Sequence, residues 1–255
     1  MGEAVASAIL RLARVNQEDL VLELGAGTGE LGVHLARSTR YVGVDSSPAM
    51  LEVFRAKVSS GSHQLLVSDA DHAWPVPSSS ARVILASRVI HLLDAEHAAR
   101  EATRVCLPGG YVMLGRINRD PDSVKERLRR HRQHLLREWG IQPRQGEAGS
   151  RNLIERLTQA GWADLGRQVV AAWTGEVSVE QILSEWGTLS RMGSVDVESG
   201  ARERILGDIR GWAAHEYGDL DRPLPYREQY MLDIAQLSDV ALTTMPEGNA
   251  CKTNS

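Results

Sequence analysis

The sequence is poor in the residues that cross-link small folds or bind metals through sulfur. It has only two cysteines, Cys106 and Cys251, so neither a disulfide framework nor a site with several thiolate ligands is indicated. Low cysteine content is typical of proteins in a reducing compartment. We therefore expect a cytoplasmic protein.

Long apolar runs and an excess of positive charge are also absent. No apolar stretch reaches the roughly 18 residues that a transmembrane helix needs, and the start of the chain does not resemble a secretory signal. The formal net charge of −4 gives no sign of a nucleic-acid surface. With 255 residues, of which 42% are hydrophobic, the chain suits one large α/β domain with neither membrane nor nucleic acid as partner.

The clearest feature that is present is an apolar run ending at a glycine-rich turn. Residues 21–24 predict a buried strand, residues 25–29 a turn with three glycines, and residues 30–37 a helix. A second apolar run over 41–44 ends at Asp45. Glycine lets a ligand approach the backbone closely and permits positive φ, and an acid after the second strand can accept both ribose hydroxyls. The pattern predicts a nucleoside-binding βαβ unit.

The spacing of the glycines and acids distinguishes between two classes of cofactor that such a unit can bind. Residues 27–32 formally fit the Gly-x-Gly-x-x-Gly pattern of dinucleotide sites. However, Glu23 inside the strand and Glu30 at the helix start would repel a pyrophosphate, and they suit a ligand with an ammonium and a sulfonium. The segment from Glu23 to Gly29 resembles motif I of the class I S-adenosylmethionine-dependent methyltransferases, and residues 42–45 resemble the strand that follows it.

Three later segments resemble the same family. Residues 65–70 resemble its third strand, residues 81–87 its fourth, and residues 104–114, with Pro108-Gly109-Gly110, its turn into a fifth strand. The resemblance implies an α/β, Rossmann-like fold with a seven-stranded mixed sheet in the order 3-2-1-4-5-7-6, strand 7 antiparallel. The cofactor it implies is S-adenosylmethionine, released as S-adenosylhomocysteine.

The resemblance also implies a donor site at the ends of these strands. Glu23 and the glycine turn would hold the methionine part, Asp45 the ribose, and Asp69 with Ala70 the adenine. Ser46 either contacts the adenosine or begins the next helix with its neighbours. The whole expected set is Glu23, Gly25, Ala26, Gly27, Gly29, Asp45, Ser46, Asp69, Ala70, Ser87 and Arg88.

His91 is the candidate general base, because the pKa of imidazole suits proton abstraction from a hydroxyl or an amine. The Val-x-His context also resembles that of many methyltransferases whose acceptors differ from one another. A structural role for His91 beside the cofactor therefore stays open. His131, His134 and Glu138 have the spacing of metal ligands, but the surrounding arginines favour a solvated basic face and no metal site. That face, with Arg129 and Arg132, is alternatively a site for an acidic acceptor.

Beyond the fifth strand, we expect a helical cap on one methyltransferase domain over residues 1–243. Its insertions are predicted at about 118–150 and 175–225, and residues 244–255 are predicted to be a disordered tail. The predicted elements are helices over 3–15, 123–139, 152–160, 178–189 and 197–217, and strands over 165–173 and 226–237. Ser178 to Gln181 has the spacing of a capping box.

The sequence therefore predicts a methyltransferase that acts on a small-molecule acceptor, of the kind found in specialised metabolism. The predicted cap favours a small-molecule acceptor. The loop after the fourth strand favours one too, because it reads Ser87-Arg88-Val89-Ile90 and not the Asn-Pro-Pro-Tyr type that resembles nucleic-acid and amide methylation sites. The acceptor is expected to be acidic, or aromatic because of Trp173, Trp186, Trp212, Tyr226 and Tyr230. Two alternatives stay open, a non-catalytic S-adenosylmethionine-binding module and a nicotinamide-dependent oxidoreductase. The methylated atom and the oligomeric state also stay open.

Overall fold

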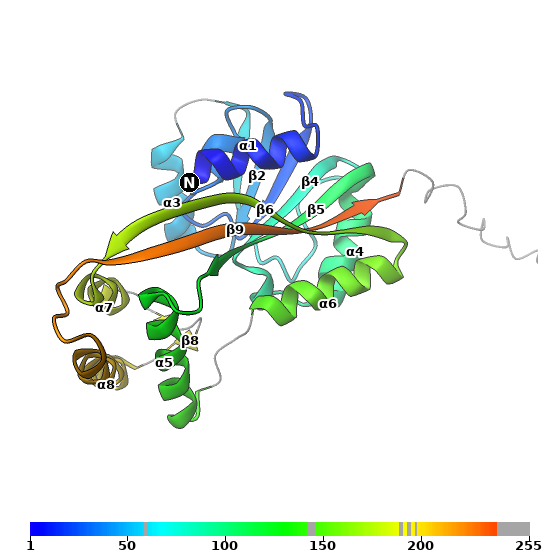
Figure 1. Cartoon of the computed structure of the whole chain (residues 1–255). Helices are drawn as coiled ribbons and strands as arrows, with labels where there is room; N and C mark the ends of the chain where they lie inside the picture. The colour runs from blue at the N-terminus through cyan, green and yellow to red at the C-terminus, as the bar shows by residue number, and fades with distance from the viewer. Residues whose placement is uncertain (59–60, 142–145, 189–190, 193–194, 197, 239–255) are drawn as a thin grey trace, which may run out of the picture.

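A seven-stranded sheet runs through the computed structural model (Figure 1), which describes residues 1–238 except 59–60, 142–145, 189–190, 193–194 and 197. The strand order is β3-β2-β1-β4-β5-β9-β6. Strands β1 to β5 pair in parallel, and β9 is antiparallel to both of its neighbours. The strands are β1 (Leu20–Leu24), β2 (Arg40–Asp45), β3 (His63–Val67), β4 (Ala81–Ser87), β5 (Cys106–Arg119), β6 (Trp162–Val177) and β9 (Leu224–Leu237). The predicted sheet order and the antiparallel last strand are confirmed.

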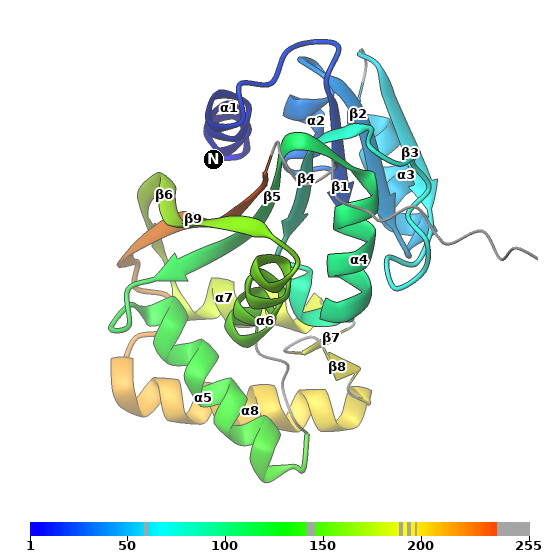
Figure 2. The same cartoon turned by 90° about the vertical axis from the view of Figure 1, so that its right-hand side faces the viewer.

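Helices cover both faces of this sheet (Figure 2). Parallel strands are buried on both faces, and the two faces here have separate apolar clusters. Ile9, Leu35 and Phe54 pack on one face, and Ala102 and Leu157 on the other. The helices concerned are α1 (Gly2–Leu12), α2 (Gly32–Leu35) and α3 (Pro48–Lys57) on the first face, and α4 (Ala95–Val105) and α6 (Gly146–Gln159) on the second.

Two predicted helix starts are confirmed in atomic detail. At the start of α3, the Ser47 side chain accepts a hydrogen bond from the Met50 amide at 3.4 Å, and Pro48 is the first helical residue. At the start of α7 (Val179–Thr188), Ser178 N donates to Gln181 Oε1 at 2.9 Å, and Gln181 N donates to Ser178 Oγ at 3.1 Å. This reciprocal pair is a capping box.

The strands β5, β9 and β6 are the longest of the sheet, and their far ends carry a second group of helices (Figure 1). We call α5 (Val124–Glu138), α7 and α8 (Ser199–Tyr217) the cap. The cap has an apolar cluster of its own, formed by Val124, Leu128, Leu136, Val179, Ile182, Leu183, Ile205, Ile209 and Ala213. A short hairpin of β7 (Arg191–Met192) and β8 (Val195–Asp196) lies between α7 and α8 in the chain and was not predicted.

Several predicted boundaries were wrong. The helix predicted over 30–37 is only α2, because Ser38 N and Thr39 Oγ1 both donate to Leu35 O, at 2.9 and 3.1 Å, and turn the chain. The third strand ends at Val67, since Asp69 begins a turn in which its Oδ1 accepts from Asp71 N at 3.0 Å. Helix α6 begins six residues before the predicted start, at Gly146.

Cys251 and the predicted tail over 244–255 lie outside the described residues. Among the helices that the structure describes, none has the length and apolar character needed to cross a bilayer.

Candidate active site

A small cavity lies between the glycine-rich turn that follows β1 and the end of β4. We call it the turn cavity. Six of the predicted site residues line it, namely Glu23, Gly25, Ala26, Gly27, Ser87 and Arg88. Met1, Thr28, Glu30, Leu31, Ile117 and Tyr230 complete the lining. Met1 at the start of α1 therefore forms part of the wall of the cavity.

The turn requires glycine for both conformational and steric reasons. Gly25, Gly27 and Gly29 have φ of +65°, +54° and +79°, in the left-handed region. A side chain at Gly25 would collide with Val89, and one at Gly29 would collide with the Phe54 ring. At Gly27 a Cβ would meet nothing closer than 3.9 Å, so the space above the turn is open to a ligand.

Asp45 holds this turn against β2. Its Oδ2 accepts a hydrogen bond from Gly27 N at 2.8 Å, and its Oδ1 accepts one from Ser47 N at 2.9 Å. The Ala26 amide also donates to Val44 O at 3.0 Å. A carboxylate has about four acceptor sites, so Asp45 keeps capacity to accept hydroxyl groups as well.

Glu23 is a buried acid at the base of the turn cavity. It is 3% exposed, and its Oε2 accepts a hydrogen bond from the Tyr41 hydroxyl at 2.5 Å. Burial raises the pKa of Glu23 to about 7, against the lowering effects of the Tyr41 hydrogen bond and the Arg88 charge. A cationic group in the cavity would favour the ionised form of this acid.

The opposite wall is made by Ser87 at the end of β4 and by Tyr230 from β9. Their hydroxyl oxygens are 2.5 Å apart. Tyr230 is 2% exposed, and burial raises its pKa to about 12. The ring fits because residue 115 is glycine, where any side chain would collide with the Tyr230 hydroxyl. The sequence alone indicated Tyr230 only as one of the cap aromatics, and the signal for its place in the site is this glycine inside the fifth strand.

Arg88 has an unusual backbone for a residue with a side chain, with φ of +60°. Its Nη2 donates to Glu30 Oε2 at 2.7 Å, which joins the residue after β4 to the residue after the glycine turn. Such strained positions are concentrated at functional sites.

The remaining predicted residues lie further along the same edge of the sheet, outside the turn cavity. Ser46 is exposed between β2 and α3. Asp69 follows β3, is largely exposed, and has its Oδ2 3.6 Å from His72 Nδ1. Ala70 is buried, and its carbonyl accepts a hydrogen bond from Trp74 Nε1 at 2.9 Å.

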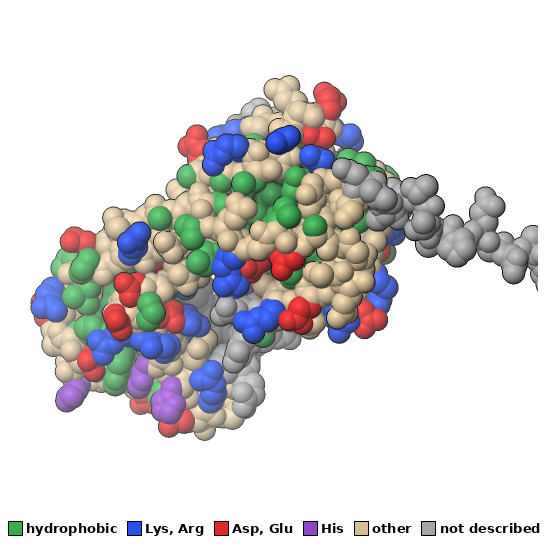
Figure 3. Space-filling model, turned by 45° about the vertical axis from the view of Figure 1, so that its right-hand side comes forward, with side chains coloured by type: hydrophobic (Ala, Val, Ile, Leu, Met, Phe, Trp, Pro, Cys, Tyr) green, Lys and Arg blue, Asp and Glu red, His purple; other side chains and the backbone are tan. Residues whose placement is uncertain are grey.

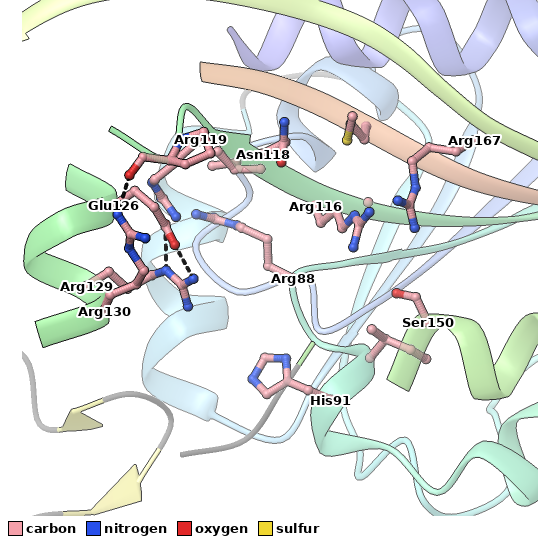
Figure 4. A pocket seen from close by; sticks show the side chains of 15 residues that line it. Arg88, His91, Arg116, Asn118, Arg119, Glu126, Arg129, Arg130, Ser150 and Arg167 are labelled. Atoms are coloured by element: carbon pink, nitrogen blue, oxygen red, sulfur yellow. Dashed lines mark hydrogen bonds and ion pairs between the residues drawn. The ribbon is translucent and has the colours of Figure 1, made fainter. Parts of the chain in front are cut away.

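A second cavity of about 470 Å³ adjoins the first, with Arg88 and Ile117 in the walls of both. We call it the arginine cavity, because six arginines line it, namely Arg88, Arg116, Arg119, Arg129, Arg130 and Arg167. Figure 4 shows them around a common space, with His91 at its edge. Among the lining residues that the structure describes, Glu126 is the one acid.

Comparisons with known proteins bear directly on this arrangement. Residues 21–110, which contain β1 to β4 and the glycine turn, match a family model described as a methyltransferase domain. Over these residues the chain is similar to a methyltransferase domain, in agreement with the order of its sheet.

The curated relatives match only part of the chain. Methyltransferase GfsG of Streptomyces halstedii is 31% identical over 122 residues, which are 46% of this chain and 44% of that protein. The chain spans less than half the length of the curated relatives it matches.

Solved structures resemble nearly the whole chain. YcgJ protein from Bacillus subtilis has a TM-score of 0.56 at 18% identity, over 92% of this chain and 98% of that one. Geranyl diphosphate methyltransferase in complex with SAM has a TM-score of 0.52 at 14% identity, over 92% and 85%. Identities this low show the fold alone, and the shared fold extends over nearly the whole chain.

The basic face predicted on α5 is less solvated than expected. Arg132 is mostly buried over the Trp186 ring, 4.0 Å from its centre, and burial lowers its pKa to about 10. His131 stacks on Trp212 with ring centres 4.2 Å apart, and burial lowers its pKa. Neither residue lines the arginine cavity. Over the described residues, no three His, Cys, Asp or Glu side chains are placed to hold a metal ion.

Proposed function

We propose that the chain is an S-adenosylmethionine-dependent methyltransferase with a small-molecule acceptor. The observation that carries the proposal is the buried Glu23 carboxyl beside an open glycine turn. An acid that is half ionised near pH 7 in a cavity suits a cationic ligand, and the sulfonium donor is one. The dinucleotide alternative is weaker, because the same acid would oppose a pyrophosphate.

The residues present fit this donor. Glu23 would bind the ammonium of its methionine part, and Asp45, with acceptor capacity left, would bind the ribose hydroxyls. Asp69 and Ala70 would contact the adenine, and Ser87 and Arg88 would lie beside the methionine end. When bound, the donor supplies a methyl group already activated for displacement by the positive sulfur.

The chain's own work is then to align the acceptor and exclude water. The arginine cavity shares Arg88 and Ile117 with the turn cavity, so an acceptor there would lie next to the donor. Its volume of about 470 Å³ is that of a small-molecule site. His91 lines this cavity and would take a proton from an acceptor hydroxyl or ammonium.

Calorimetry with S-adenosylhomocysteine and with NADH tests the donor class. We expect the sulfur ligand to bind and NADH not to bind. Asp45→Asn should weaken the affinity at least tenfold, because the amide nitrogen cannot accept a hydrogen bond. Glu52→Gln on the exposed side of α3 is the matched control and should bind as the parent chain does. Tight NADH binding without a response to S-adenosylhomocysteine would contradict the proposal.

Catalysis needs a separate measurement. The purified protein with S-adenosylmethionine is mixed with candidate metabolites, and mass spectrometry should detect the gain of one methyl group on an acceptor. If His91 is the base, His91→Ala loses turnover while keeping its donor affinity. Near-normal turnover in that variant would assign His91 a structural role.

A further inference from the structure

We infer that the acceptor carries a phosphate or diphosphate group, which binds in the arginine cavity. The inference deepens the proposed function and rests on it. The charge of the lining is the first observation, since its described residues hold six guanidinium groups and a single carboxylate. Apolar side chains are a minority of the lining, so a purely hydrocarbon or aromatic acceptor does not match it.

Buried acids position two of these arginines from outside the cavity. Arg119 Nε donates to Glu228 Oε1 at 2.7 Å, and Arg167 Nε donates to Asp233 Oδ1 at 2.6 Å. Glu228 and Asp233 are 4% and 8% exposed and do not line the cavity. Both acids come from β9, so the strand fixes the two guanidinium groups from behind. An arginine has five N–H donors, so the pairing of Arg119 through its Nε leaves others of that side chain for a ligand.

The helix α5 adds arginines with different partners. Arg129 Nε donates to Glu126 Oε2 at 2.7 Å, whereas Arg130 Nη2 donates to the neutral Pro121 carbonyl at 2.5 Å. In Figure 4, Arg119, Arg129 and Arg130 lie on one side of the cavity, and Arg116 and Arg167 lie on the other. Donors that converge from several directions suit a tetrahedral oxyanion better than a planar carboxylate.

The position of the cavity links this anion site to the methyl donor. It lies between the body of the sheet and the cap, where Figure 3 shows a hollow with both basic and acidic side chains around it. Arg88 is shared with the turn cavity and is paired to Glu30. An acceptor whose phosphate binds the far arginines would extend its other end toward the turn cavity.

Inorganic pyrophosphate is the probe for this site. It is titrated by calorimetry into the full chain at low ionic strength, with S-adenosylhomocysteine present, and we expect one binding event. Arg130→Gln and Arg116→Gln, from opposite sides of the cavity, should each weaken it about tenfold or more. Glu126→Gln removes the acid of the lining and should strengthen binding severalfold, an effect that loss of folding cannot imitate.

The matched control is Arg137→Gln, which removes the same charge from an exposed position on α5 outside the cavity. The affinity of this variant for pyrophosphate should stay within about twofold of that of the parent chain, since exposed charges at a distance are screened. Equal weakening by Arg130→Gln and Arg137→Gln would overturn the inference, as would no pyrophosphate binding at all. Tighter binding of malonate than of pyrophosphate would overturn the phosphate assignment in favour of a dicarboxylate.

The two proposals fail separately in this design. If S-adenosylhomocysteine binds and pyrophosphate does not, the anion site is wrong and the methyltransferase proposal stands. If pyrophosphate binds with the expected response to Arg130 but S-adenosylhomocysteine does not bind, the anion site stands and the donor assignment fails.

Discussion

At the scale of single residues, Glu23 shows how a local cost in stability points to a ligand. A carboxyl group buried in a strand is expensive to ionise, and here burial raises its pKa to about 7 despite the Tyr41 hydrogen bond. An apolar residue would pack in β1 without that cost. The acid is explained if a cation occupies the cavity above it.

The raised pKa of Glu23 makes stability depend on pH. Because the folded pKa lies above the unfolded value of 4.5, the neutral form stabilises the fold fully below pH 4.5. That contribution is lost as the pH rises through about 7. We expect urea unfolding of the ligand-free protein to show a loss on the order of a few kcal/mol over this window. Glu23→Gln should lack that component, and an identical pH profile in both proteins would contradict the assignment.

Donor binding should show the opposite dependence on pH. A bound ammonium prefers the ionised acid, so the affinity for S-adenosylhomocysteine should fall as the pH drops from 8 to 6. Below the pKa of Glu23, the affinity can fall by at most about tenfold per pH unit, because one proton is taken up. Calorimetry at three pH values checks this, with Glu23→Gln as the variant that should respond least.

At the scale of elements, glycines have different roles in the turn and in the helices. Gly29 lies in a left-handed conformation under the Phe54 ring, whereas Gly207 inside α8 has open space where a side chain would point. The first is required by the turn, and the second only lowers helix propensity.

We therefore expect alanine to have opposite effects at these two positions. Gly29→Ala should destabilise the protein by about 3 kcal/mol, through backbone strain and collision with Phe54. Gly207→Ala should stabilise it by about 0.5–1 kcal/mol. Chemical denaturation of both variants measures the difference. If Gly29→Ala were neutral, the close packing of the turn against α3 would be wrong.

At the scale of the whole molecule, the cap is a separately packed unit on long strands. Its apolar cluster shares none of its buried residues with the two clusters that flank the sheet. The long strands β5, β9 and β6 join it to the rest of the sheet, and the arginine cavity lies at that junction. Packing in the cap should therefore affect the acceptor side more than the donor side.

Leu128→Ala tests this division. Leu128 is fully buried in the cap, and its truncation should cost about 3 kcal/mol of local stability. Hydrogen exchange should speed up in α5, α7 and α8 and stay unchanged in β1 to β4, with S-adenosylhomocysteine affinity preserved. Leu157→Ala is the matched control in the core beside the sheet, where it should loosen α6 and its neighbours instead. Uniform acceleration in both variants would show that the cap is not a separate unit.

Local patterns in the sequence determined the glycine turn, the strands around it and the capped starts of α3 and α7. Each of these depends on residues close together in the chain, where apolar runs, glycines and caps act directly on the backbone. The family resemblance extended this to the sheet order. The same resemblance allowed the donor residues from Glu23 to Arg88 to be predicted, since they lie in or just after successive strands.

Only the tertiary structure decided which distant residues meet at the site. Tyr230 reaches the turn cavity because β9 pairs antiparallel with β5, opposite a glycine at residue 115. Arg119, Arg130 and Arg167 come from β5, α5 and β6 and share one cavity, while Arg132 on the same basic helix packs on Trp186 instead. Strand pairing and helix packing bring together residues that are far apart in the chain, such as Ser87 and Tyr230, which are 143 positions apart. No local pattern in the sequence records which side chains will then share a space.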